Sequence, residues 1–106
     1  MVETLEDKKA EDIVLLDLQD QAIFTDFFVI CTASSERQLG ALVDAVDEAA
    51  RTRHNLKSPR QEGHAVGGWV LADFGVVIVH VFSAAQRRRY RLEELWHDGK
   101  VLVRIQ

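Results

Sequence analysis

Cysteine and proline are scarce in this sequence, which contains one of each in 106 residues. The single thiol, Cys31, excludes an intrachain disulfide, and its position in the apolar run 27–31 predicts a buried side chain in a reducing compartment. No stretch approaches the roughly 18 consecutive apolar residues of a membrane span, and residues 1–10 are charged and acidic, unlike a signal or transit peptide. These absences predict a cytoplasmic protein that does not enter a membrane.

An excess of positive charge is also missing. The net charge is −4, whereas binding of bare RNA or DNA through its phosphates requires clustered lysine and arginine. An acidic protein is instead steered toward a basic protein partner. The basic residues that are present gather in two places, residues 51–60 and residues 87–91.

Motifs that carry chemistry are absent as well. The four histidines are not paired at the spacing of a zinc site, no Gly-x-Ser-x-Gly motif occurs, and no glycine-rich loop enters a helix. We therefore predict no catalytic residue, no metal ligand and no cofactor. One alternative stays open at the ends of two predicted strands, where Asp17, Asp20 and Asp26 would either hold Mg²⁺ or act as ordinary turn formers. The turn interpretation is favoured, because carboxylates at strand ends commonly form turns.

A hydrophobic content of 47% supplies the core of one domain over residues 1–106. Capping patterns at Thr4 and Ser35 predict helices over residues 4–11 and 35–53, and the second also has apolar residues at helical spacing. Branched apolar runs predict buried strands over residues 13–18 and 27–32.

The second half of the chain continues this alternation. Residues 69–75 and 76–82 form a predicted hairpin with Gly75 in the turn. A helix over 84–96 and a strand over 101–105 follow, and one more strand before the hairpin is left open. The predicted fold is an α/β domain with a mixed sheet flanked by helices. His80, within the last strand of the hairpin, is expected to be hydrogen-bonded at a sheet edge or at the core margin, and at least one of Trp69 and Trp96 is expected in the core.

Several blocks of the sequence resemble one known family in collinear order. They are WVLADFG at 69–75, VHVF at 79–82 and R-x-x-Y-x-L-E-x-L-W at 87–96, preceded by KAED at 9–12, D-x-FVI at 26–30, SERQ at 35–38 and EG at 62–63. This set resembles the signature of the Iojap, or ribosomal silencing factor, family over nearly the whole chain.

The resemblance implies a sheet similar to the nucleotidyltransferase fold but without its catalytic residues. It implies a non-enzymatic protein that binds the large ribosomal subunit through ribosomal protein number fourteen, blocks joining of the small subunit and so represses translation. Organelle relatives act in large-subunit assembly, and isolated members can form homodimers. The alternatives are therefore an assembly factor and a divergent Mg²⁺-dependent nucleotidyltransferase-like enzyme.

The residues that match the family signature predict where the partner binds. They lie in the hairpin and in the last helix: Trp69, Leu71, Asp73, Tyr90, Glu93 and Trp96. Carboxylates there suit the cations of a basic ribosomal protein, and the aromatic residues suit the desolvated centre of an interface. In the arginine run, Arg87 and Arg88 are candidates for contact with ribosomal RNA or with the partner protein.

Overall fold

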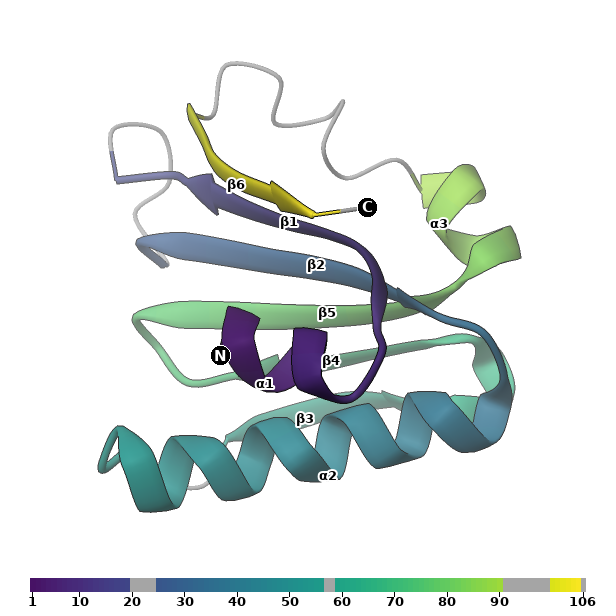
Figure 1. The fold of residues 1–106 in the computed structure, drawn as a ribbon, viewed down its shortest axis with the longest axis horizontal. Helices are drawn as coiled ribbons and strands as arrows, with labels where there is room; N and C mark the ends of the chain where they lie inside the picture. Colours follow the sequence, from purple (N-terminus) through teal and green to yellow (C-terminus); the bar gives the residue numbers. More distant parts are fainter. Residues whose placement is uncertain (20–24, 57–58, 91–99, 106) are drawn as a thin grey trace.

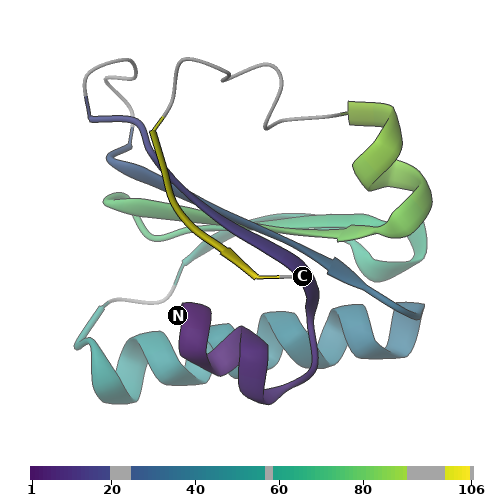
Figure 2. The same ribbon diagram turned by 45° about the horizontal axis from the view of Figure 1, so that its top comes forward.

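The computed structural model describes residues 1–19, 25–56, 59–90 and 100–105. Within them, six strands form one mixed sheet in the order β3-β4-β5-β2-β1-β6, with helices on both faces (Figures 1 and 2). This arrangement confirms the predicted fold class. The elements in chain order are α1 Val2–Asp7, β1 Glu11–Asp17, β2 Phe27–Ala33, α2 Glu36–Arg53, β3 Arg60–His64, the 3-10 turn η1 Ala65–Gly67, β4 Trp69–Asp73, β5 Val77–Ser83, α3 Ala84–Tyr90 and β6 Lys100–Ile105.

The sheet is mixed because β2 runs parallel to β5, whereas the other neighbouring strands are antiparallel. The predicted hairpin is β4 and β5, and Gly75 in its turn has a φ of +89°. The Asp73 carboxylate accepts a hydrogen bond of 2.8 Å from the Gly75 amide, which fixes the turn. The strand left open before the hairpin is β3, an edge strand whose residues are all exposed.

The long helix α2 begins where the sequence predicts. The Ser35 side chain accepts a 3.0 Å hydrogen bond from the Gln38 amide, as an N-cap should. The Gln38 side chain bonds Ser34 and also donates to the carbonyls of Lys8 and Lys9, so it links the start of α2 to the turn before β1. The apolar side of α2 lies against one face of the sheet (Figure 2). Among the described helices, none combines the length and apolar character that crossing a bilayer requires.

The prediction for the first helix was wrong in its boundaries and its cap. The helix α1 starts at Val2 and ends at Asp7, and Thr4 lies inside it, buried, instead of capping it. Leu5, also buried, joins the core beneath α2. The capping pattern misplaced the helix because the packing of one buried turn determines its position.

Packing on the α1 and α2 side of the sheet is aliphatic and tight. The strands contribute Ile13, Val29, Val79 and Val81, and all are at most 2% exposed. Cys31 is fully buried in this layer, as predicted. Burial raises the pKa of its thiol to about 12, against a smaller opposing effect of Arg87, so the thiol stays protonated and unreactive.

On the other side of the sheet, α3 covers one end (Figure 2). Arg87 anchors this helix: its guanidinium donates to the Asp12 carbonyl at 2.9 Å and to the Thr32 hydroxyl at 3.0 Å. Only 9% of Arg87 is exposed, so the prediction that it contacts RNA or the partner at the surface is corrected. Its charge instead satisfies polar groups at the bulge of β1 and the end of β2. The predicted continuation of the helix to residue 96 lies outside the described residues.

Candidate functional site

The hairpin residues chosen from the sequence share one face of the sheet. Trp69, Leu71 and Asp73 alternate along β4 with Val70 and Ala72, and the latter two pack into the core beneath α2. The three therefore lie on the opposite side, where the cross-strand partners of Trp69 and Leu71 on β5 are Phe82 and His80. We call the surface made by these side chains and their neighbours the aromatic face; its residues are Glu62, Trp69, Leu71, Asp73, His80, Phe82 and Tyr90.

Three rings form the centre of the aromatic face. The Trp69 ring lies 5.0 Å from that of Phe82 and 4.5 Å from that of Tyr90, measured between centroids. Phe82 is fully buried and Trp69 half-buried, whereas Tyr90 remains 42% exposed. The Arg89 guanidinium lies 5.8 Å from the centre of the Tyr90 ring, within cation–π range. The structure thus brings Trp69 and Tyr90 together, with part of the stack open to a partner.

The buried His80 side chain fixes the position of the Trp69 ring through a hydrogen bond. The Trp69 indole N–H donates to His80 Nδ1 at 3.2 Å, and Phe28 approaches the imidazole edge-on at 4.7 Å. Burial lowers the pKa of His80 to about 4, so the ring is neutral at physiological pH and Nδ1 is free to accept. The prediction of a hydrogen-bonded histidine at the core margin is confirmed.

The edge strand β3 adds polar groups that the sequence did not assign to the site. Its register places Glu62 across from Leu71, so Glu62 shares the aromatic face, and places His64 across from Trp69 at the margin of that face. A cavity of about 160 Å³ lies there, lined by Glu62, Gly63, Trp69 and Leu71. The EG block at 62–63 was the available signal, but only the strand register shows that it adjoins Trp69.

The remaining predicted site residues do not all lie on the aromatic face. Asp73 shares the face, but its carboxylate bonds the Gly75 amide. Arg88 is exposed on α3, unlike Arg87, which is buried. Glu93 and Trp96 lie outside the described residues.

The carboxylates of the enzyme alternative are not gathered into a site among the residues that the structure describes. The Asp17 carboxylate accepts a hydrogen bond from the Gln19 amide at 3.0 Å, as a turn former does. Asp26 is half-buried, and its main chain bonds Leu18 and Val76. Asp20 lies outside the described residues. Across the described part of the chain, no three His, Cys, Asp or Glu side chains are grouped to hold a metal ion.

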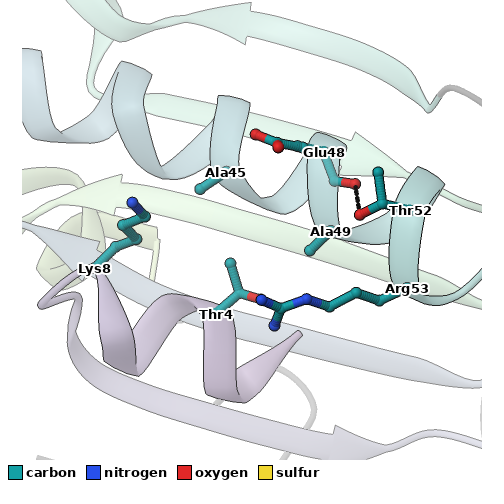
Figure 3. Close-up of a pocket in the computed structure, with 7 residues that line it drawn as sticks. All are labelled: Thr4, Lys8, Ala45, Glu48, Ala49, Thr52 and Arg53. Carbon is teal, nitrogen blue, oxygen red and sulfur yellow. Dashed lines mark hydrogen bonds between the residues drawn. The ribbon is translucent and has the colours of Figure 1, made fainter.

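Two of the hollows on the side of the sheet that α1 and α2 cover, called the helix-covered side, offer a comparison. One of about 190 Å³ separates α1 from α2, where Lys8 and Arg53 enter from opposite ends over a floor that includes Ala49 (Figure 3). The other, of about 450 Å³, is more apolar and is bordered by Leu15 and Val76 among others. Neither hollow is lined by any of the predicted site residues. Substitutions in them can therefore serve as controls for substitutions on the aromatic face.

Known proteins resemble this chain in both sequence and structure. The family model described as "Ribosomal silencing factor during starvation" matches residues 1–106. The chain is 39% identical over 98 residues to the ribosomal silencing factor RsfS of Halalkalibacterium halodurans, covering 92% of this chain and 83% of that protein. A crystal structure of a protein from Chromobacterium violaceum superposes with a TM-score of 0.84 at 36% identity, covering 91% of this chain and 79% of that chain.

A more distant relative carries an assembly name. The mouse protein named "Mitochondrial assembly of ribosomal large subunit protein 1" is 30% identical over 98 residues, which cover 91% of this chain and 43% of the mouse protein. The family model matches the full chain, and the bacterial relative aligns over most of both chains. Both findings support the same family assignment. The chain belongs to the ribosomal silencing factor family.

Proposed function

We propose that this protein binds the large ribosomal subunit through its aromatic face and sterically prevents the small subunit from joining. The observation that carries the proposal is the stack of Trp69 and Tyr90, which is half-exposed on the same face of the sheet as the acidic residues Glu62 and Asp73. Aromatic anchors with acidic neighbours fit a basic protein partner, and membership of a silencing family makes the ribosome the expected one.

Ribosomal protein number fourteen of the large subunit is the proposed docking point, with the cytoplasm as the place of action. A contact of about 800 Å² per partner is enough for stable binding. The bound domain then occupies volume that the small subunit needs, and the two compete by mass action. In this proposal no bond is made or broken, so the protein is not an enzyme.

Cosedimentation with purified large subunits tests the docking surface. We expect the wild-type protein to pellet with the subunit, and Trp69→Ala to lose most of this binding while its circular dichroism stays native. The control is Val76→Asp, which alters the apolar hollow on the other side of the sheet. Normal binding by Trp69→Ala together with loss by Val76→Asp would move the binding surface to the helix-covered side.

Sucrose gradients distinguish silencing from assembly, the second candidate function, which the name of the mouse relative favours. A silencing factor shifts joined ribosomes toward free subunits when it is added to mature particles. An assembly factor leaves mature ribosomes joined, and its loss instead causes large-subunit precursors to accumulate. Titration with nucleotide and Mg²⁺ tests the enzyme alternative separately, and saturable turnover that is lost in Asp17→Asn would support that alternative.

A further inference from the structure

We propose that the cavity lined by Glu62, Gly63, Trp69 and Leu71 binds an arginine side chain of the protein partner. The inference rests on the proposed function, since the partner supplies the arginine. It adds which chemical group is recognised and by which residues. Glu62 becomes the residue that determines the charge specificity of the site.

The walls of the cavity suit the long arginine side chain. Trp69 provides an indole surface on which a guanidinium stacks, and Leu71 provides an apolar wall for the methylene groups. Both are half-buried, and their positions are fixed by Phe82 and His80 beneath them. A rigid apolar wall of this kind costs little conformational entropy when the partner binds.

Gly63 allows β3 to lie close to β4 beside the cavity. Its φ is +91°, a conformation that other residues rarely adopt, and a Cβ atom at this position would overlap the Trp69 carbonyl oxygen. Without a side chain, Gly63 brings the main chains of β3 and β4 into register next to Glu62. The glycine of the EG block is therefore explained by the local geometry of the site.

Glu62 is the acceptor available for the cation. Its side chain is exposed, and no described residue forms a hydrogen bond or ion pair with its carboxylate. Asp73, in contrast, already accepts a hydrogen bond from the Gly75 amide, and its cross-strand partner on β3 is Arg60. A carboxylate accepts both parallel N–H groups of a guanidinium, whereas a lysine offers a single ammonium and no planar surface to stack.

Binding to large subunits at several salt concentrations tests the role of the carboxylate. We expect Glu62→Gln to weaken binding about tenfold or more, since a charge-assisted hydrogen bond is lost, and to make the affinity less sensitive to salt. The matched control is Glu48→Gln, which removes an equal charge from an exposed position on α2. This control should bind as the wild type does. Circular dichroism establishes that both variants are folded.

Double-mutant cycles identify the ligand. Glu62→Gln is combined with Arg→Gln and Lys→Gln changes, one at a time, in the purified partner protein, and one arginine should show strong non-additivity. Coupling to a lysine alone would overturn the arginine assignment. Wild-type affinity and salt dependence for Glu62→Gln, with binding lost in Trp69→Ala, would refute this inference and leave the proposed function standing. Normal binding by Glu62→Gln and Trp69→Ala alike would refute both.

Discussion

The two faces of the sheet differ in the side chains that they leave partly exposed. Both faces bury aliphatic residues: Leu42 is fully buried beneath α2, and Leu16 and Ile30 are at most 1% exposed on the opposite side. On the aromatic face, however, Trp69 is only half-buried, and its indole N–H bonds His80. Aliphatic packing stabilises the fold on both sides, whereas rings with polar atoms hold their shape while one side stays exposed. The difference assigns recognition to the aromatic face, where partly exposed rings lie on top of a buried core.

The largest effect is expected from a cavity beneath α2. Leu42→Ala should lower the free energy of unfolding by about 2–5 kcal/mol, because the fully enclosed site cannot collapse around the lost methyl groups. Urea denaturation measures the loss. Binding of the folded variant to large subunits should match the wild type, and a selective binding defect would contradict the division between the faces.

Acid should weaken the fold through His80. The pKa of this buried imidazole is about 4, against 6.5 for the free group, so the unfolded chain takes up the proton first as pH falls. The stability that the neutral ring contributes is complete above pH 6.5 and decreases toward pH 4, by up to about 3 kcal/mol. Unfolding experiments across this range should give a shallower decline for His80→Gln. Equal slopes for both proteins would show that His80 does not set the acid response.

A smaller free-energy change with a clear functional result is expected at Tyr90. Its ring is 42% exposed, so Tyr90→Ala should change the free energy of unfolding by about 1 kcal/mol or less. Binding to large subunits should weaken about tenfold or more, as for a truncated aromatic anchor. Val101→Ala, at an exposed apolar residue on the opposite edge strand β6, is the matched control. Equal affinities for these two variants would remove Tyr90 from the interface.

The smallest overall effect, with a modest loss of stability and none of binding, is expected at the start of α2. Ser35→Ala removes the side-chain acceptor of the Gln38 amide and should cost about 1 kcal/mol in unfolding free energy. Thermal denaturation should show a lower midpoint with unchanged binding to large subunits. A binding defect here would mean that recognition extends to the helix-covered side.

Local patterns in the sequence predicted the elements whose residues carry their own signals. The Ser35 cap and the apolar spacing behind it located α2, and Gly75 located the hairpin turn. The edge strand β3 has no such pattern, because its five residues are all exposed and do not alternate between apolar and polar side chains. Its extended conformation is imposed by pairing with β4.

The candidate site was predictable only in part. The family resemblance singled out Trp69, Leu71 and Asp73, and the structure shows that these three residues share one face of β4. The place of Glu62 beside them depends on strand register, which the sequence does not specify for a polar edge strand. Arg87 looked like its exposed neighbours, and only the docking of α3 shows which arginine of the run is buried.

The central claim is that the bound aromatic face keeps the subunits apart. Light scattering during mixing of purified subunits measures their joining directly. The account predicts that saturating wild-type protein lowers the rate and extent of joining, and that Tyr90→Ala at the same concentration restores much of both. Joining at full rate while the large subunit is demonstrably saturated with the wild-type protein would contradict it.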